Sequence, residues 1–493
     1  MIHFFYVAFF LLVSLVSLKF LFQTRRPKNF PPGPPYLPVI GNLHQIKQPL
    51  HRTFNGLSQK YGQIFSLVFG SHKVVVVSSL SIVQECFTKN DVTLSDRPKL
   101  LIGKYLGYNY TAVGFSPYGD HWRNLRRIIS LEVLSSHRLN SSLEIRRDEI
   151  MRLIQKLAQD SSKDFAKVEL KSKLLELTFN TMMRILTGKR YFGEDLDASD
   201  IEEAKEFREI IKELVVFSDF IPAVGFGWLG FDPEKNIKSI GLRFDAFIQR
   251  RIDEHRNGKK IINSMIHHLL TLQQSEPQYY TDQIIKGLIL DLLIGGTDTS
   301  GTTLEWTMSN LLNHPEIIKK ARKELDIHIG QDRLVDESDI AKLPYLQNIV
   351  RETLRLHPVL PLLVPRSLSK DCIIGGYKLP QNTTLVVNAW AIHTDPNLWT
   401  DPLLFKPERF EKEGEANKLL AFGSGRRSCP GANMAQRTMS LTLALLIQCF
   451  EWKRTKEELI DMTEGNGMIV VQKKFQLEAM CRVRQLSTIK DIL

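Results

Sequence analysis

One cysteine lies in a loop whose composition suits reactive chemistry. Cys429 belongs to the stretch 422–431, which reads FGSGRRSCPG. Next to glycine the backbone amides can approach the sulfur closely, and the two arginines add positive charge, so both features favour the thiolate over the thiol. A helix-forming run, 432–448, follows the loop and adds the positive end of its dipole. The loop predicts a nucleophile, a metal ligand or a buried structural cysteine, and a ligand is favoured over a nucleophile because no histidine is paired with it.

A second candidate site interrupts the longest apolar run of the chain. The segment 282–312 has helical spacing, but residues 295–300 in its middle read GGTDTS. A glycine inside a helix costs about 1 kcal/mol relative to alanine, and Thr and Asp can form local hydrogen bonds instead. One interpretation is a kinked helix where a large group approaches the backbone, with Asp298 and Thr299 beside it to move protons. The other is a kinked core helix in which Asp298 caps the second half.

A third candidate is a charged pair at helical spacing. Glu352 and Arg355 lie on one face of a predicted helix at 346–358. Such pairs are usually solvated and stabilise a helix by a few tenths of a kcal/mol. Apolar neighbours such as Leu354 leave a buried pair as the alternative, which would need further hydrogen-bond partners. Arg409, in the stretch 405–410, is a candidate third member.

The elements around these residues are predicted to be mostly helical. Helical spacing runs through most of the chain from about residue 119 to residue 357, and a β-hairpin precedes it. No linker, repeat or low-complexity segment divides the chain after Gly41. The sequence therefore predicts one large, mainly α domain with a minor β region. The expected helices are 50–61, 146–157, 168–186, 201–216, 240–256, 282–312, 346–358 and 432–448, and the expected hairpins are 64–70 with 73–79 and 376–390.

Composition excludes several classes of protein. The 493 residues are 43% hydrophobic, so the chain is neither disordered nor fibrous. The five cysteines are scattered, without a C-x-x-C pair or zinc spacing, so neither a disulfide framework nor a zinc site is indicated. The net charge of +11 is spread through mixed-sign stretches, so nucleic acid is not the expected partner. A G-x-G-x-x-G match at 225–230 lacks a preceding strand and does not indicate a dinucleotide site.

The N-terminus has the pattern of a membrane anchor. Residues 2–22 are almost wholly apolar, a length that suits one helix across a bilayer. Arg25, Arg26 and Lys28 follow, which predicts the N-terminus in the lumen and the rest of the chain in the cytosol. The alternative, a cleaved secretory signal, would need a basic leader and a small-residue cleavage site, and neither is evident. Residues 30–39 are rich in proline and predict a stiff, extended spacer.

Five patterns, together with this N-terminus, resemble the haem-thiolate monooxygenases of the cytochrome P-450 superfamily. E-x-x-R alone is weak evidence for this superfamily, but five patterns that follow an anchor and a proline hinge are specific evidence. The resemblance covers the whole chain. It implies the mostly helical fold of that superfamily with a small β region. The patterns are W-x-x-x-R at 122–126, (A/G)-G-x-(D/E)-T-(T/S) at 295–300, E-x-x-R at 352–355, P-E-R-F at 407–410 and F-x-x-G-x-R-x-C-x-G at 422–431.

The resemblance implies a role for each matching residue. Cys429 would be the axial thiolate ligand of the iron of haem b, and Phe422 belongs to the same cofactor-binding loop. Asp298 and Thr299 would deliver protons for dioxygen activation. The two glycines at 295–296 would leave room for dioxygen where the helix passes over the porphyrin. Charge-assisted hydrogen bonds to the haem propionates would come from Trp122, Arg126, Arg366 and Arg427. A structural network would consist of Glu352, Arg355 and Arg409.

Closer resemblance is to plant microsomal members, especially the isoflavone 2′- and 3′-hydroxylases. It implies NADPH- and dioxygen-dependent hydroxylation of a plant phenolic, with the B-ring of an isoflavone (2′- or 3′-hydroxylation) as the expected target. The alternative is another aromatic metabolite or the closure of a methylenedioxy bridge. Gly295, where alanine is expected, and Arg366, where histidine is frequent, depart from the pattern. The resemblance is carried by 41–54, 116–127, 135–151 and 309–317, and specificity is expected to differ at 100–113, 212–227, 359–364 and 467–471.

The same resemblance implies an organisation and partners. An anchor at 1–23 and a basic, proline-rich hinge at 24–40 would hold a catalytic domain, 41–493, on the cytosolic side of the endoplasmic reticulum. NADPH would act through a separate membrane-bound reductase whose acidic domain docks near Cys429, with cytochrome b5 as an optional second donor. A haem protein that does not activate dioxygen is less favoured because Asp298 and Thr299 are both present. A tethered binding protein without haem would lack Soret absorbance.

Overall fold

The computed structural model describes residue 14 and residues 28–161, 164–193, 198–217, 233–257, 264–465, 467 and 470–484. The predicted anchor, apart from Ser14, lies outside these residues, as do part of the hinge and the glycine pattern at 225–230. None of the helices within these ranges combines the length and the apolar character needed to cross a bilayer.

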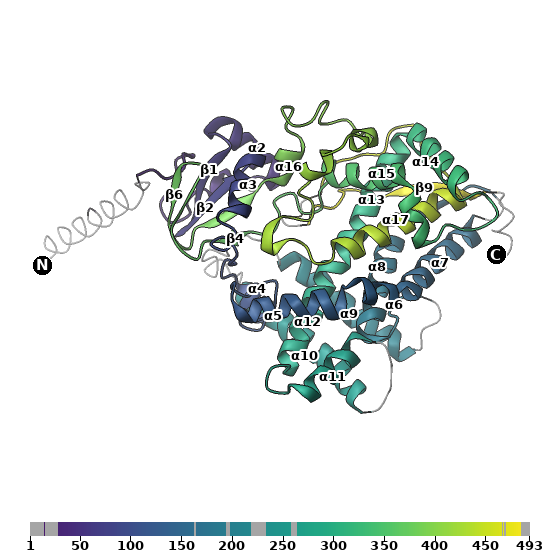
Figure 1. The fold of residues 1–493 in the computed structure, drawn as a ribbon, viewed down its shortest axis with the longest axis horizontal. Helices are drawn as coiled ribbons and strands as arrows, with labels where there is room; N and C mark the ends of the chain where they lie inside the picture. The colour runs from purple at the N-terminus through teal and green to yellow at the C-terminus, as the bar shows by residue number, and fades with distance from the viewer. Residues whose placement is uncertain are drawn as a thin grey trace, which may run out of the picture.

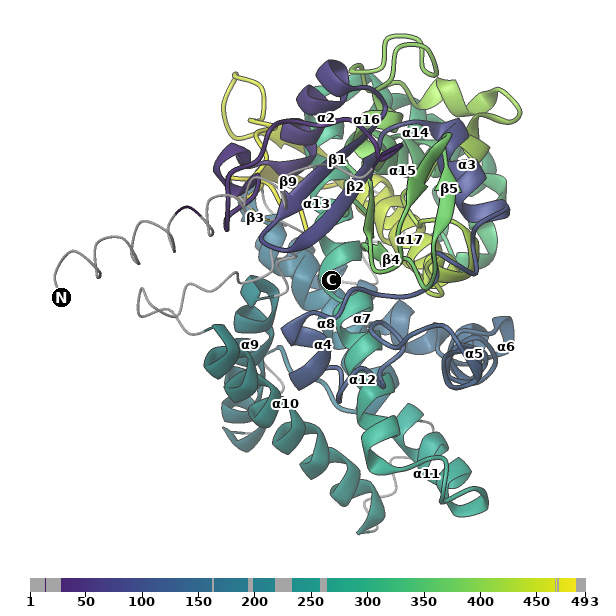
Figure 2. The same ribbon diagram turned by 90° about the vertical axis from the view of Figure 1, so that its left-hand side faces the viewer.

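Helices make up most of the described chain and short strands form a minor part, which confirms the predicted fold class. Figure 1 shows β1, β2, β4 and β6 on the side nearer the N-terminus, and Figure 2 shows α9 to α12 away from these strands. The helices are α2 Leu50–Tyr61, α3 Leu80–Thr88, α4 Leu101–Tyr105, α5 Asp120–Ile128, α6 Ser136–Ser141, α7 Leu143–Asp160, α8 Leu170–Thr187, α9 Ala198–Phe217, α10 Pro233–Arg256, α11 Met265–Ser275, α12 Asp282–Gly296, α13 Asp298–Asn313, α14 Pro315–His328, α15 Pro344–Leu356, α16 Ala389–His393 and α17 Ala432–Cys449. The strands are β1 Ile64–Phe69, β2 His72–Val77, β3 Ala166–Glu169, β4 Arg366–Ser367, β5 Cys372–Ile374, β6 Tyr377–Leu379, β7 Thr384–Val387, β8 Phe450–Arg454 and β9 Glu478–Val483.

Helix α13 lies inside the largest hydrophobic core. Every residue from 300 to 312 is buried, because α8, α15 and α17 all pack against this helix. Helix α8 approaches closely at Gly301, where an added Cβ would lie 3.0 Å from Leu175 Cδ2 and 3.1 Å from Thr178 Oγ1. A larger residue at this position would require Leu175 and Thr178 to shift.

The largest sheet has the strand order β1-β2-β7-β4. The predicted hairpin of β1 and β2 is confirmed, with Ile64 opposite Val77. Strand β7 runs parallel to β2, with Val74 opposite Thr384, and antiparallel to β4. The other sheets are β3-β9-β8 and β5-β6.

The predicted hairpin at 376–390 is wrong. Strand β6 pairs with β5, because Gly375 and Gly376, with φ of +54° and +81°, form a two-residue turn between Ile374 and Tyr377. All residues of β7 are buried, as expected of an inner strand, and β7 therefore lies between β2 and β4.

Candidate active site

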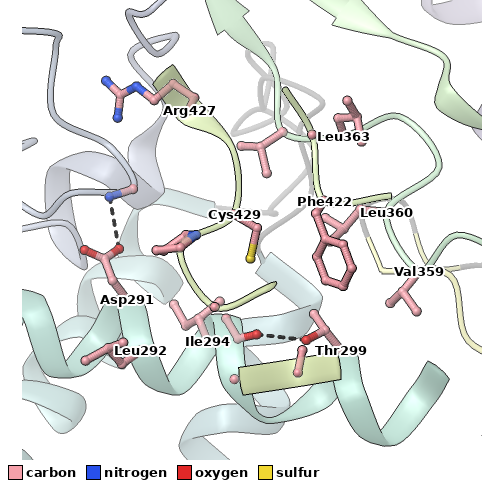
Figure 3. A pocket seen from close by; sticks show the side chains of 18 of the residues that line it. Asp291, Leu292, Ile294, Thr299, Val359, Leu360, Leu363, Phe422, Arg427 and Cys429 are labelled. Carbon is pink, nitrogen blue, oxygen red and sulfur yellow. Dashed lines mark hydrogen bonds between the residues drawn. The ribbon is translucent and has the colours of Figure 1, made fainter. Parts of the chain in front are cut away.

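A cavity of about 460 Å³ lies at the junction of α12 and α13, next to the loop that precedes α17. Figure 3 shows Cys429 and Phe422 of that loop facing Ile294 and Thr299 of the junction. The structure brings all the predicted site residues to the wall of this one cavity: Trp122, Arg126, Asp298, Thr299, Arg366, Phe422, Arg427 and Cys429.

Glycines give the cysteine loop its shape. Gly423 and Gly425 both have a φ of +69°, which residues with a side chain rarely adopt. A Cβ on Gly425 would also lie 2.5 Å from Asp91 Oδ1. The Cys429 amide donates a hydrogen bond to the Phe422 carbonyl (2.8 Å), which closes the loop. The side chain of Cys429 is accessible because it borders the cavity, although protein atoms surround it on its other sides.

The electrostatic setting of Cys429 differs from the sequence-based expectation. Burial raises the pKa of the thiol, and the backbone amides of Gly431 and Ala432 and the charge of Arg126 offset this only in part. The side chains of the loop's own arginines make contacts elsewhere. The Arg427 guanidinium donates to the carbonyls of residues 95, 113 and 116, and Arg426 Nε lies 3.8 Å from Asp91 Oδ2. A coordinated cation would therefore be needed to hold this sulfur as a thiolate.

Four arginines border the cavity, and one of them, Arg366, is paired with Asp91 (3.0 Å). Burial, together with the charges of Arg366 and Arg126, lowers the pKa of Arg427 to about 9. Arg97, which the sequence analysis missed, also has a lowered pKa because it is buried beside Arg427 and Arg366. Its guanidinium donates to the carbonyls of residues 114, 364 and 365. Nothing in the sequence marks Arg97, since it matches no pattern and its neighbours in space are far away along the chain.

These residues fit a planar cofactor that carries carboxylates. The indole nitrogen of Trp122, which lines the cavity, is buried and has no hydrogen-bond partner within the described residues. The Arg427 guanidinium lies 4.6 Å from the centre of the same indole ring. A donor without an acceptor beside a cluster of cations suits the propionates of haem, and a cysteine sulfur at the wall of the cavity suits its iron.

The predicted helix at 282–312 is in fact two helices that meet at Thr297. The hydroxyl of Thr299 donates to the carbonyl of Gly295 (2.8 Å), and the hydroxyl of Thr297 donates to that of Leu293 (2.8 Å). A Cβ on Gly295 would meet no atom within 4 Å, so this glycine widens the cavity. Gly296 also lines the cavity, and a Cβ there would lie 2.7 Å from Met182 Sδ, so this position is small for packing as well.

Asp298 begins α13 at the wall of the cavity. The N-cap position of α13 is Thr297 and not Asp298, which argues against the capping interpretation. Burial raises the pKa of Asp298, and Lys171 on α8 opposes this rise. A carboxyl group in this setting holds its proton to higher pH than an exposed aspartate.

A second acid in the cavity wall was also missed. Asp291 of α12 accepts a hydrogen bond from the Gly114 amide (3.1 Å; Figure 3), and burial raises its pKa to about 7 despite nearby Arg427 and Arg97. It ties the segment around Gly114 to α12. The signal in the sequence was one acid within the apolar run of 288–294.

The pair of Glu352 and Arg355 is buried, not solvated. Both side chains are 0% exposed, with bonds of 2.7 and 2.8 Å from Arg355 to the two carboxylate oxygens. Arg409 adds a third charge at 3.1 Å, as predicted, and Arg355 donates further bonds to the carbonyls of residues 393, 402 and 404. These carbonyls belong to the segment that leads to the cysteine loop, so the network fixes that segment against α15.

Comparisons with known proteins agree with this geometry. The family model described as Cytochrome P450, here written cytochrome P-450, matches residues 31–479. The chain is 65% identical to cytochrome P-450 81E8 of Medicago truncatula over 97% of both chains. It is 57% identical to an isoflavone 2′-hydroxylase of Glycyrrhiza echinata (97% of this chain, 96% of the relative) and 56% identical to an isoflavone 3′-hydroxylase of Medicago truncatula (97% and 98%). The chain therefore belongs to the cytochrome P-450 family and is a haem-thiolate monooxygenase whose electrons come from NADPH through a partner reductase.

Proposed function

We propose that this protein hydroxylates the B-ring of an isoflavone at the 2′ or 3′ position. The observation that carries the proposal is an apolar cavity beside Cys429, in a chain more than half identical to isoflavone 2′- and 3′-hydroxylases. Most of the wall away from the arginines is hydrocarbon, which suits a flat aromatic substrate and excludes water. The apolar wall includes Leu100, Ile102, Val113, Phe115, Leu292, Ile294, Val359, Leu360, Leu363 and Val470.

In this proposal each predicted site residue has one task. Cys429 ligates the haem iron, and the Phe422 ring packs beside it. The propionates are held by Trp122, Arg126, Arg366 and Arg427. When bound, haem supplies the activation of dioxygen, and the thiolate favours cleavage of the O–O bond. Arg97 is a further donor to the propionates because it lines the same cavity and is buried beside Arg427 and Arg366.

Asp298 and Thr299 move protons in this proposal. Burial raises the pKa of Asp298, so its carboxyl holds a proton to higher pH than an exposed aspartate does. The Thr299 hydroxyl donates its hydrogen bond to the Gly295 carbonyl. Its oxygen can therefore still accept a hydrogen bond from solvent or from Asp298. Rotation of the hydroxyl away from that carbonyl would then present a proton to the cavity.

The setting of the enzyme is part of the proposal. Residues 1–23 would anchor it in the endoplasmic reticulum, and residues 24–40 would connect the anchor to the cytosolic catalytic domain. The reductase would dock where the cysteine loop reaches the surface, because the half-exposed Arg426 offers positive charge there to an acidic partner. Cytochrome b5 would use the same surface.

The test uses microsomes that contain the protein and a plant reductase, supplied with NADPH and a simple isoflavone. The expected product is one oxygen heavier, hydroxylated on the B-ring, and absent without NADPH or with Cys429→Ala. Hydroxylation confined to another ring, or no product from any isoflavone, would contradict the substrate proposal. A product two hydrogens lighter from a methoxylated substrate would favour bridge closure instead.

A further inference from the structure

A short antiparallel ribbon near the C-terminus forms part of the cavity wall. It consists of residues 463–465 and 470–474 and is called the C-terminal ribbon below. Glu464 lies opposite Lys473 in it, and two backbone hydrogen bonds of 2.8 and 2.9 Å join its strands. Val470 of this ribbon lines the cavity. The position of the ribbon therefore decides where one apolar part of the wall lies.

The C-terminal ribbon is bonded to a second part of the same wall. The Val471 amide donates to the Val359 carbonyl (2.9 Å), and the Val471 carbonyl accepts from the indole nitrogen of Trp306 on α13 (3.2 Å). The same indole ring stacks on His357, with ring centres 4.4 Å apart and planes 3° from parallel. Val359 lines the cavity too (Figure 3). Because Val359 and Val470 are both attached to Val471, a shift of the ribbon would displace both.

Two polar contacts hold the second strand of the ribbon against the helices of the core. Lys473 Nζ donates to Ser309 Oγ of α13 (2.9 Å), and Gln472 Oε1 accepts from Lys171 Nζ of α8 (2.9 Å). These contacts restrain the strand 470–474 directly. The first strand is restrained by a different contact, which involves α2.

Glu464 ties the first strand of the ribbon to α2, which lies 412 residues earlier in the chain. Its carboxylate oxygen Oε2 is 2.6 Å from Arg52 Nε and 3.2 Å from His51 Nε2. The side chain of Glu464 is 6% exposed and that of His51 is 1% exposed, whereas Arg52 is half-exposed. Burial alone would raise the pKa of Glu464, but its two neighbours outweigh burial and lower the pKa to about 2. A carboxylate is therefore held between two groups of α2 at any working pH.

Trp390 provides a second connection between α2 and the cavity wall. The Arg52 guanidinium lies 4.7 Å from the centre of the indole ring of Trp390. The Trp390 amide donates to the Pro361 carbonyl (3.1 Å), two residues beyond Val359. The wall around Val359 is thus connected to α2 both through Glu464 and through Trp390.

A buried carboxylate between two donors does more to fix a position than to stabilise the fold. Desolvation of the charges is unfavourable, and apolar residues of similar volume often serve stability equally well. Charge-assisted hydrogen bonds, however, have a defined length and direction that apolar packing lacks. A displacement of about 1 Å at a reacting centre can change a rate by about 100-fold, so a contact that fixes the wall also bears on the reaction.

We propose that the contact of Glu464 with His51 and Arg52 fixes the wall formed by Val359 and Val470, and thereby determines which ring carbon of the substrate is presented for hydroxylation. The inference rests on the proposed hydroxylation of the isoflavone B-ring and names what selects between its carbons. Glu464 is a positioning residue, because it acts through the C-terminal ribbon.

The first test measures the ratio of 2′- to 3′-hydroxylated product in microsomes with the reductase and NADPH. We expect Glu464→Gln, which keeps the shape of the side chain but not its charge, to change this ratio by about threefold or more. Glu451→Gln is the matched control, because Glu451 pairs with Arg482 (2.7 Å) but is 40% exposed, and it should leave the ratio unchanged. An unchanged ratio in Glu464→Gln, with haem content verified by the carbon monoxide difference spectrum, would overturn the inference.

Arg52→Gln serves the same purpose if Glu464→Gln fails to retain haem. Arg52 is half-exposed, so its replacement opens no core, and it removes one of the two partners of Glu464. We expect a smaller change of the product ratio in the same direction. No change in Arg52→Gln would then overturn the inference.

A double variant tests whether Glu464 acts through the wall. Val470→Ala should itself change the product ratio, because it removes part of the wall. Glu464→Gln added to Val470→Ala should change the ratio much less than it does alone. Two effects that simply multiply would show that Glu464 acts by another route, and would overturn the inference.

Binding of 1-phenylimidazole and 4-phenylimidazole tests the wall without any hydroxylation. Both bind haem iron through an imidazole nitrogen but project the phenyl ring in different directions, so the ratio of their dissociation constants reports the shape of the wall. We expect Glu464→Gln to change this ratio, measured by spectral titration, by about threefold, and Glu451→Gln to leave it unchanged. An unchanged ratio in Glu464→Gln would overturn the inference. If the wild-type protein forms no B-ring product, the proposed function fails, and the probe ratio still decides whether Glu464 fixes the wall.

Discussion

Replacement of Arg355, whose guanidinium is buried, should lower the free energy of unfolding far more than replacement of an arginine one turn earlier. Arg355→Met takes away both bonds to Glu352 and three bonds to backbone carbonyls. Breaking a fully buried ion pair from one side costs about 3–5 kcal/mol, because the remaining charge stays buried. Arg409 still contacts the carboxylate, so we expect the lower half of that range. The equilibrium constant for folding would then fall by roughly 10²- to 10³-fold.

The matched control is Arg351→Met on the same helix. Arg351 is only half-buried and, among the residues that the structure describes, makes a single side-chain bond, to Asn348 Oδ1 (2.7 Å), so its loss should cost about 1 kcal/mol or less. Urea unfolding followed by circular dichroism gives both free energies, and the carbon monoxide difference spectrum reports whether the cysteine loop keeps its haem. Equal losses in the two variants, or a loss below about 1 kcal/mol for Arg355→Met, would refute the reasoning from burial.

Three further predictions concern the cavity wall. Gly295→Ala should fold normally and gain up to about 1 kcal/mol in unfolding free energy. Gly296→Ala should lose stability, because the added Cβ meets Met182. Thermal unfolding measures both changes. Trp122→Phe, which removes an unpaired donor and keeps the aromatic ring, should weaken haem retention without weakening the fold, measured as haem released to apomyoglobin over time. The pKa of Asp291 is raised to about 7 in the folded protein, so the free energy of unfolding should fall as pH rises from about 4 to 7. Asp291→Asn removes this ionisation and should make that fall less steep. An unchanged slope, an unchanged haem release rate or equal melting of the two glycine variants would contradict the respective prediction.

Local patterns predicted the elements well, and motif spacing predicted the residues of the site. The helix at 50–61 and the strands around Val74 were visible from periodicity, because each depends only on neighbours in sequence. All eight predicted site residues line one cavity. Each of them except Arg366 could be found because it belongs to a pattern shared with a known family.

Contacts between distant segments could not be predicted. Arg97 and Asp291 reach the cavity only after the chain has folded; no pattern marks Arg97, and the single acid in the apolar run of 288–294 does not show by itself what Asp291 contacts. The pairing of β7 with β2 was missed for the same reason, since Thr384 meets Val74 from the other end of the chain. The burial of Glu352 was equally undecided in the sequence, because the carbonyls to which its partner Arg355 donates lie beyond residue 390.

The parallel pairing of β2 and β7 has a consequence for synthesis of the protein on the ribosome. Roughly 300 residues separate the two strands, and translation at about 5–20 residues per second takes about 15–60 s to supply the second one. During that interval the valines of β2 have β1 on one edge and an open edge on the other. A nascent chain in this state exposes a row of backbone donors and acceptors beside apolar side chains, so we expect it to depend on chaperones that shield open strand edges until residue 387 has emerged.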